Sequence, residues 1–339
     1  AAGLRGADGL IVLLDVMAGA GLEYLVRRSS SSGDVHVVAE LSGFRPERDT
    51  LLTIGVFDGV HLGHRLLIER VIREAGARSL MSGVVTFNGH PRTVLSNGTR
   101  LARLTSPEER TSILRSIGVD FVVPLTFTSE LAALTAREFI SLLMEHLRMR
   151  GLIVGPGFAM GRGREGNVGA LQKLGNEIGF TVEEVEPLAM EDSIVSSTAI
   201  REALSRGDMR TASKMLGRHF SLSGSVVGGE ERGRVLGFPT ANIGVDGEQA
   251  LPYDGVYATL GHVGDEVYRS VTNIGVRPTF GEGKRSVETF LMDFDGDVYG
   301  RELTIELVER LRGELKFADA AELTAQIGKD AEQARAVLG

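Results

Sequence analysis

The residues best suited to chemistry lie in one short turn, Thr53-Ile-Gly-Val-Phe-Asp-Gly-Val-His-Leu-Gly-His64. An apolar, β-favouring run from Leu51 to Phe57 leads into this turn, and apolar residues at helical spacing follow it. We therefore expect His61 and His64 at a helix N-terminus. Free N–H groups and the helix dipole favour an anion there, and imidazole donors can follow charge onto a leaving phosphate. The turn predicts a nucleotide triphosphate site; the alternative is two surface histidines.

Other residues of the same turn are expected to hold phosphate. Glycines allow the backbone to approach a ligand closely. Asp58 orients either the turn or a metal-bound water, and a simple turn-forming role is equally compatible with the sequence. The phosphate-binding residues expected here are Gly55, Phe57, Asp58, Gly59 and Gly63.

Residues 55–64, Gly-Val-Phe-Asp-Gly-Val-His-Leu-Gly-His, resemble the nucleotidyltransferase family that carries a His-x-Gly-His turn, and specifically its FAD synthetase branch. This ten-residue string is much more specific than the four-residue motif. The resemblance implies transfer of an adenylyl group from ATP to FMN, with His61, His64 and Arg201 as catalytic residues at the leaving pyrophosphate. It also implies further phosphate-binding and flavin-binding segments.

Two segments qualify as further parts of this site. Ser196-Ser-Thr-Ala-Ile-Arg201 begins a helix, which by itself also fits an ordinary N-cap. The resemblance assigns Ser197, Thr198 and Arg201 to the triphosphate. His90 follows a predicted strand and is expected at the same sheet edge as His61, although a capped turn explains it equally well.

A glycine-rich, basic loop at residues 155–166 resembles the loop of the family near the nucleotide and flavin sites. We assign Phe158 to flavin binding on this basis. Three positions depart from the family pattern: Gly157 replaces an acidic residue, Met160 an aromatic residue, and Gly89 the first proline of a Pro-His-Pro turn. These departures affect the flavin side and leave the first phosphate motif intact.

In the second half of the chain, residues 233–242, Gly-Arg-Val-Leu-Gly-Phe-Pro-Thr-Ala-Asn, resemble the riboflavin kinase signature. The resemblance places ATP at Gly237, Pro239 and Thr240. The hydroxyl of Thr240 and the amide oxygen of Asn242 are hard ligands suited to Mg²⁺. The alternative is an ordinary turn between two strands.

Glu288, on a predicted strand, is the expected catalytic base of the kinase half. This role is implied by the resemblance, because an isolated strand glutamate usually faces solvent. Asn273 and Arg277 are expected to border the flavin, although turn or barrel-closing roles fit equally well. Arg312 belongs to a segment that flanks the flavin in the family.

The predicted elements alternate between strand and helix up to about residue 206. Strands are expected at Val35–Ala39, Leu51–Phe57, Val84–Phe87, Phe121–Leu125, Leu152–Val154 and Thr181–Val185. Helices are expected from Leu66 to Ala75, after Ser106, after Thr135, and from Val168 to Ile178. Ser106 and Thr135 each precede a glutamate by three positions, as in a capping box. The order predicts an α/β Rossmann-like nucleotidyltransferase domain with a parallel sheet.

Short, glycine-punctuated strands follow and predict a small antiparallel β-barrel with a C-terminal helix. The strands are expected at Ser221–Val227, Gly255–Leu260, Val267–Asn273, Val287–Phe294 and Leu303–Leu311, and the helix at Ala320–Leu338. Hairpins are expected at Gly264-Asp265 and at residues 295–297. We divide the chain into an amphipathic or disordered extension (1–34), an adenylyltransferase domain (35–206) and a kinase domain (207–339).

The composition of the 339 residues excludes several classes of protein. The absence of cysteine excludes disulfides, thiolate catalysis and cysteine zinc sites, and fits a cytoplasmic protein. A net charge of -8 argues against nucleic-acid and anionic-membrane partners. No apolar run is long enough to span a bilayer.

We therefore expect a bifunctional enzyme that resembles the prokaryotic riboflavin kinase/FAD synthetase family. The resemblance implies two MgATP-dependent steps, riboflavin to FMN in the barrel and FMN to FAD in the first domain. The small molecules riboflavin, FMN and ATP are the expected partners, and any homo-oligomer is expected to be transient. Two alternatives stay open: a kinase with a weak or inactive adenylyltransferase domain, and a non-catalytic flavin-binding regulator.

Overall fold

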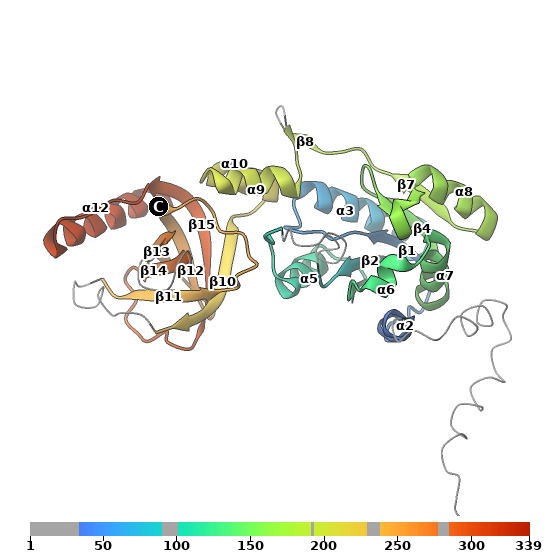
Figure 1. The fold of residues 1–339 in the computed structure, drawn as a ribbon, viewed down its shortest axis with the longest axis horizontal. Coiled ribbons are helices and arrows are strands. Elements are labelled where there is room, and N and C mark those ends of the chain that lie inside the picture. Colours follow the sequence, from blue (N-terminus) through green and yellow to red (C-terminus); the bar gives the residue numbers. More distant parts are fainter. Residues whose placement is uncertain (1–33, 90–100, 191–192, 229–237, 277–284) are drawn as a thin grey trace, which may run out of the picture.

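The computed structural model describes residues 34–89, 101–190, 193–228, 238–276 and 285–339 (Figure 1). The expected extension lies outside these ranges apart from its last residue. The predicted site residues His90, Gly237 and Arg277 lie outside them as well. The described chain forms a sheet domain and a barrel, with two helices between them (Figure 1).

The first domain contains the predicted parallel sheet, which has five strands in the order β3-β2-β1-β4-β7. Its strands are β1 (Thr50–Ile54), β2 (Met81–Phe87), β3 (Phe121–Leu125), β4 (Met149–Val154) and β7 (Thr181–Glu184). Its larger helices are α2 (Asp34–Ser42), α3 (Leu62–Ala77), α5 (Pro107–Ser116), α6 (Ser129–Ala133), α7 (Ala136–Leu147) and α8 (Val168–Ile178). Short elements are β5 (Ala159–Met160), a 3-10 turn (Arg162–Arg164), β6 (Gly166–Asn167), β8 (Ala189–Met190) and β9 (Ser193–Ile194).

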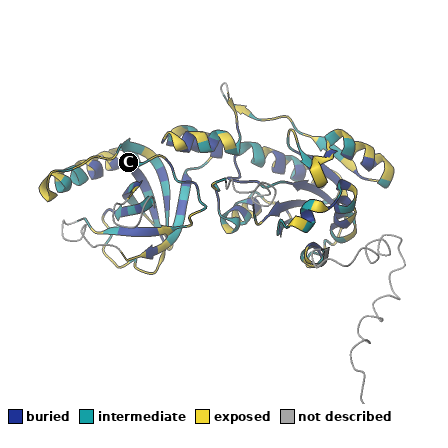
Figure 2. Ribbon diagram, in the orientation of Figure 1, coloured by how far each residue is buried: buried dark blue, intermediate teal, exposed yellow. Residues whose placement is uncertain are grey.

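Helices cover both faces of this sheet. One hydrophobic cluster packs α3 and α5 against the sheet, and another packs α2, α7 and α8 against the opposite face. All five residues of β1 are buried, as expected for a central parallel strand (Figure 2). The strand order reverses between β1 and β4, and ligands of open α/β sheets bind at such a point.

The prediction of a strand at Val35–Ala39 is wrong, because these residues belong to α2. Val37 and Leu41 are both buried and lie four positions apart, which is the spacing of one helix face. Packing of α2 against α6 and α7 therefore outweighs the β preference of the valines.

The second domain is an antiparallel β-barrel, as predicted. It is closed, and its strand order is β10-β11-β14-β13-β12-β15. The strands are β10 (Phe220–Val227), β11 (Thr240–Val245), β12 (Gly255–Val263), β13 (Glu266–Val276), β14 (Arg285–Leu291) and β15 (Glu302–Arg312). The final helix, α12 (Ala320–Leu338), matches its predicted bounds and packs outside the barrel against β12, β13 and β15.

Two features of the barrel differ from the prediction. The hairpin at Gly264-Asp265 is present between β12 and β13, but residues 295–297 form no hairpin. They join β14 to β15, which pair with different neighbours, so this connection crosses an end of the barrel. The second difference is β11: the sequence predicts ligand-binding roles for Thr240 and Asn242 but no strand there.

Helices α9 (Ser197–Ser205) and α10 (Met209–Leu216) connect the domains (Figure 1). Helix α10 was not predicted from the sequence. Asp208 caps its start, and it ends at Gly217, which has φ 71°. α10 packs on α9 and also on β10 and β15. Direct bonds add to this contact: Arg103 pairs with Asp246 at 2.6 Å. Within the described ranges, no helix is long and apolar enough to cross a membrane.

Candidate active sites

The turn between β1 and α3 has a backbone that few residue types adopt readily. Phe57 and Val60 have φ values of 51° and 37°, and Gly59 has φ 81°. A Cβ atom at Gly59 would lie 2.8 Å from the Leu104 side chain, so the turn requires glycine at this position. Packing against the rest of the domain therefore holds the turn in shape.

His61 and His64 are locked to each other at the start of α3. His61 caps the helix, and its Nδ1 accepts a hydrogen bond from the His64 backbone N–H at 3.3 Å. The two rings stack with centroids 3.6 Å apart, and Phe57 meets the His64 ring edge-on. Because Nδ1 of His61 is an acceptor, the neutral imidazole carries its proton on Nε2 and can donate it to a ligand.

Both imidazoles are neutral at physiological pH. Burial, together with the positive charge of Arg218, lowers the pKa of His61 from 6.5 to about 4. Burial and the neighbouring His61 lower the pKa of His64 well below its usual value. The buried Nδ1 of His64 has no hydrogen-bond partner among the described residues. The two rings are therefore available as neutral hydrogen-bonding groups rather than as cations.

A cavity of about 280 Å³ opens beside these rings. Its lining comes from the ends of β1 and β4, from the start of α3 and from the segment that precedes α9. The structure thus brings together six predicted site residues, namely Gly55, Phe57, His61, Gly63, His64 and Phe158. Ser196, the N-cap of α9, also lines the cavity. Ser196 is not among the predicted site residues, although its N-cap position was a usable signal.

Asp58 and Arg201 support the turn from beneath. The buried Asp58 carboxylate pairs with the Arg201 guanidinium and accepts N–H bonds from Leu104 at 2.9 Å and Thr105 at 3.2 Å. The Ser197 hydroxyl donates to the Asp58 carbonyl at 2.8 Å. These three predicted phosphate-binding residues therefore bind one another in this structure.

Arg201 also donates from Nε to the Ala102 carbonyl at 2.7 Å. Thr198, the second residue of α9, is exposed and does not line the 280 Å³ cavity. Of the Ser196–Arg201 motif, it is Ser196 that faces the space beside the histidines.

The three residues that depart from the family pattern in the flavin-side loops lie in different surroundings. Gly157 has φ 67°, a backbone that suits glycine, and its N–H donates to Glu184 at 2.9 Å. Met160 is buried in the core of the first domain, so it packs rather than faces the cavity. Gly89 directly precedes residues outside the described ranges.

In the barrel, the predicted kinase residues fall in one row across neighbouring strands. Asn242 of β11 lies opposite Glu288 of β14, and Glu288 lies opposite Asn273 of β13. The row continues from Asn273 to Val256 of β12, and from Val256 to Arg312 of β15. Residues directly opposite in an antiparallel sheet share a face, with Cβ atoms about 5 Å apart. Five strands thus present these residues together.

This row lies on the outer face of the barrel. Val287 and Leu291, which flank Glu288 and Phe290 along β14, are buried in the barrel core, and Thr289 joins an interior chain of hydroxyls through Thr272. Val256 instead packs with Ala331 and Ala334 of α12. Glu288 therefore faces outward, on the side where α12 packs, and its Oε1 accepts a 3.5 Å bond from Ser286.

Thr240 stands two positions before Asn242 on β11, so both side chains share the face of Glu288. Threonine and asparagine oxygens opposite a carboxylate form a hard donor set, which fits Mg²⁺ held jointly with phosphate and water. Pro239 is exposed just before the strand, and Phe238 packs edge-on against Phe290. Within the described residues, no cluster of three or more histidine and carboxylate side chains forms a metal cage.

Arg312 is fixed by α12. Its guanidinium donates to the buried Asp330 carboxylate at 2.9 and 2.7 Å, and it lies over the Phe317 ring at 5.9 Å. Gln326 donates to the same carboxylate at 2.9 Å. The arginine therefore links the end of the row to the final helix.

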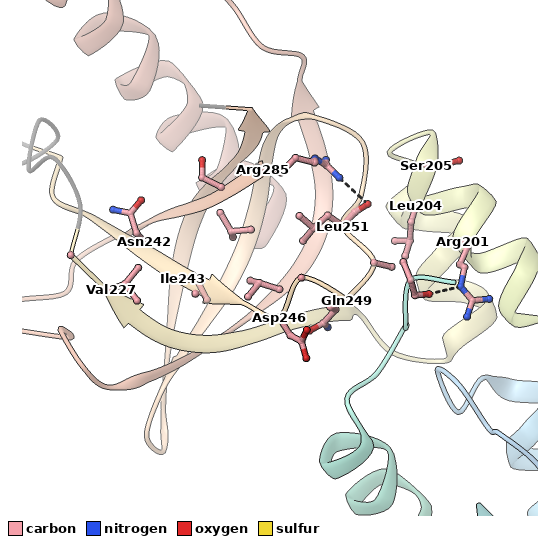
Figure 3. A pocket seen from close by; sticks show the side chains of 18 residues that line it. Arg201, Leu204, Ser205, Val227, Asn242, Ile243, Asp246, Gln249, Leu251 and Arg285 are labelled. Carbon is pink, nitrogen blue, oxygen red and sulfur yellow. Dashed lines mark hydrogen bonds between the residues drawn. The ribbon is translucent and has the colours of Figure 1, made fainter. Parts of the chain in front are cut away.

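A larger cavity, of about 920 Å³, lies between the two domains. Figure 3 shows Arg201, Leu204 and Ser205 of α9 on one side of it, and Asn242 and Ile243 of β11 on the other. Arg285 of β14 donates to the Leu251 carbonyl at 3.3 Å along its wall. Its lining shares no residue with the cavity beside the histidines.

A histidine turn at the switch point of a parallel sheet, followed by a barrel with a polar row, defines a two-domain, nucleotide-dependent transferase. The FAD synthetase family model matches residues 44–199, and the riboflavin kinase family model matches residues 216–338. The chain belongs to the family of bifunctional riboflavin kinase/FMN adenylyltransferases.

Curated relatives match over most of their length. The bifunctional riboflavin kinase/FMN adenylyltransferase of Escherichia coli strain K12 is 41% identical over 297 residues, which cover 87% of this chain and 94% of the relative. The Bacillus subtilis strain 168 protein of the same name is 36% identical, and the match covers 84% of this chain and 91% of that protein. A Streptococcus pneumoniae crystal structure titled as a macrolide-efflux protein shares the fold, with a TM-score of 0.80 and 30% identity over 87% of this chain and 96% of its own.

Proposed function

We propose that the barrel phosphorylates riboflavin to FMN and that the sheet domain then adenylylates FMN to FAD, with ATP consumed at both sites. Two features support these two reactions: a neutral histidine pair beside a cavity, and a polar row that ends at α12. The observation that carries the proposal is the alignment of Asn242, Glu288 and Asn273 on three adjacent strands.

In the proposed adenylyl transfer, an FMN phosphate oxygen attacks the α-phosphorus of ATP. The bond from the α-phosphorus to the bridging oxygen breaks, and pyrophosphate leaves. His61 donates its Nε2 proton in a hydrogen bond to the leaving group, and His64 stacks behind it. Phe158 lies in the same cavity and is proposed to contact the flavin. Asp58, Ser197 and Arg201 hold the turn in place.

In the proposed kinase step, Glu288 accepts the proton of the riboflavin 5′-hydroxyl as that oxygen attacks the γ-phosphorus of ATP, and ADP leaves. Asn273 and Arg312 lie in the same row and are proposed to border the flavin. Thr240 and Asn242 would hold Mg²⁺, which supplies charge neutralisation at the phosphates.

Three further points are proposals on the same basis. The kinase domain begins near residue 207, which leaves α10 with the barrel that it packs against. The protein works in the cytoplasm, where ATP and flavins are present. Association with other copies, where it occurs, is transient.

Reciprocal substitutions test the proposed division of labour. Glu288→Gln removes the base and is expected to stop FMN formation from riboflavin, while FAD formation from supplied FMN continues. His64→Ala is expected to do the converse. Lys173→Gln, at an exposed lysine of α8 that lines neither cavity, serves as the charge-changing control. Loss of both activities in either single variant, or of neither, would contradict the proposal.

A further inference from the structure

Three consecutive residues at the end of α10 contact the histidine turn. A Cβ atom at Gly59 would lie 3.5 Å from Leu216, and a Cβ atom at Gly217 would lie 2.5 Å from Leu62. Arg218 Nη1 donates to the Val60 carbonyl at 3.4 Å. These contacts involve Gly59 and Val60, just before His61, and Leu62, just after it. The segment 216–218 is therefore a second support for the histidine pair.

Gly217 is what allows this approach. It has φ 71°, it ends α10 in the left-handed conformation, and any side chain there would collide with Leu62. The backbone at the end of α10 can therefore pack directly against Leu62, the first residue of α3. Arg218 is carried to the back of the turn as a consequence.

Within the part of the chain that the structure describes, Arg218 forms no direct ion pair. The hydrogen bond to Val60 is the one that its guanidinium forms with the described residues. Glu109 of α5 attracts it at longer range, and that carboxylate is itself bonded to the Ser221 hydroxyl at 2.8 Å. Burial lowers the pKa of Arg218, but an arginine stays protonated at physiological pH.

Arg201 differs from Arg218 in this respect. The guanidinium of Arg201 is paired with the buried Asp58 carboxylate, which cancels most of its charge toward a ligand. The adenylyl-transfer site must nevertheless attract a polyanion, and the whole chain has a net charge of -8. Arg218 is a cation bonded directly to the histidine turn, and Arg65 of α3 adds a second positive charge nearby.

We propose that Arg218 is a positioning residue for adenylyl transfer: it holds the Val60 carbonyl and places a positive charge behind His61, toward which the triphosphate is drawn. Arg218 lies within residues 216–338, the part of the chain matched by the riboflavin kinase model. The kinase half therefore contributes to the other active site. This inference rests on the proposed FMN adenylyl transfer at the histidine turn.

Arg218→Met tests the inference in the full-length protein, with Arg210→Met as the matched control, because Arg210 is an exposed arginine of the same connection. FAD formation from supplied FMN is expected to fall at least about tenfold in Arg218→Met. Inhibition by inorganic pyrophosphate is expected to weaken by a similar factor, since the charge acts on the phosphates. FMN formation from riboflavin is expected to match wild type.

Arg218→Lys separates the charge from the packing, because lysine keeps the charge but loses the planar guanidinium. It is expected to recover most of the pyrophosphate inhibition. A structural role alone would leave pyrophosphate inhibition unchanged in all three variants, and that result would overturn the inference.

The NMR titration of His61 gives an independent readout. The groups that act on this imidazole are His64 of α3 and Arg218, and Arg218 is itself influenced by Glu109, Arg65 and Glu306. The His61 pKa is expected to rise in Arg218→Met and to stay low in Arg218→Lys. An unchanged His61 pKa in Arg218→Met would overturn the inference. Failure of the proposed function is distinguishable, because wild-type protein would then form no FAD.

Discussion

The Nδ1 atom of His61 accepts the backbone N–H of His64 at 3.3 Å while the two imidazoles stack at 3.6 Å. One hydrogen bond thus caps α3 and selects the Nε2–H tautomer of His61. The same arrangement that begins the helix prepares the donor for a phosphate ligand. It requires a neutral ring, which makes the turn sensitive to acid.

Stability at low pH is expected to reflect this requirement. The folded-state pKa of His61 is about 4 against 6.5 for the ordinary group. Between these values the unfolded chain binds more protons, so the free energy of unfolding falls as the pH drops from about 6.5 toward 4. The full effect of this shift is about 3 kcal/mol. Hydrogen exchange of the α3 amides at pH 7 and at pH 4 measures most of it.

His61→Asn keeps an N-cap acceptor and removes the titrating ring, so it is expected to reduce this pH dependence. His36→Asn is the control, because His36 is exposed. An equally steep loss of protection in His61→Asn would show that another group is responsible.

The pair of Arg201 and Asp58 is expected to stabilise the first domain. Arg201→Met leaves the buried Asp58 carboxylate without its counter-ion and is expected to lower the free energy of unfolding by about 3 kcal/mol. The double variant with Asp58→Asn is expected to recover part of that loss. Denaturant titration measures both. A stable Arg201→Met protein that fails only in FAD formation would mean that Arg201 acts on the ligand instead.

Local periodicity allowed several elements to be predicted to the residue. α8, α12 and β3 match their expected bounds, because each has a continuous apolar pattern and clear end signals. The Thr135 capping box is present, and Ser106 caps α5 as predicted by accepting the Glu109 N–H at 3.0 Å, while the Glu109 carboxylate also accepts a bond from Ser221 of the barrel. A contact from another domain cannot be predicted from a four-residue motif.

The sites show the same limit. The histidine turn could be predicted because its residues are contiguous, but Arg201 pairs with Asp58 across 143 positions of sequence. Likewise, the motifs named Asn242, Glu288 and Asn273 separately, and only the strand register places them in one row. The role of segment 216–218 depends on how α10 packs, and α10 itself was not predicted.

The Mg²⁺ dependence of FMN formation is expected to change when Asn242 is substituted. Asn242→Leu removes an oxygen donor beside Glu288 and is expected to lower FMN formation at least about tenfold, with part of the loss regained at high Mg²⁺. FAD formation from supplied FMN is expected to be unaffected. Initial rates over a Mg²⁺ series measure this, with Ser225→Ala, an exposed β10 variant, as the control. Equal loss at every Mg²⁺ concentration would argue against metal binding at Asn242.

The contact of Arg312 with Asp330 is expected to hold α12 on the barrel. Asp330→Ala leaves the arginine without its buried partner and is expected to destabilise the barrel by about 3 kcal/mol. The KM for riboflavin is expected to rise, since Arg312 ends the row that includes Glu288. Thermal unfolding and kinase kinetics check the two effects. Destabilisation with an unchanged KM would restrict Arg312 to a structural role.

The most direct test of a two-site enzyme is a chromatographic time course of the pure protein with riboflavin, ATP and Mg²⁺. FMN is expected to appear first together with ADP, and FAD is expected to follow together with pyrophosphate. Accumulation of FMN without FAD, even when FMN is supplied in excess, or the absence of any flavin phosphorylation, would contradict the existence of two working sites in this chain.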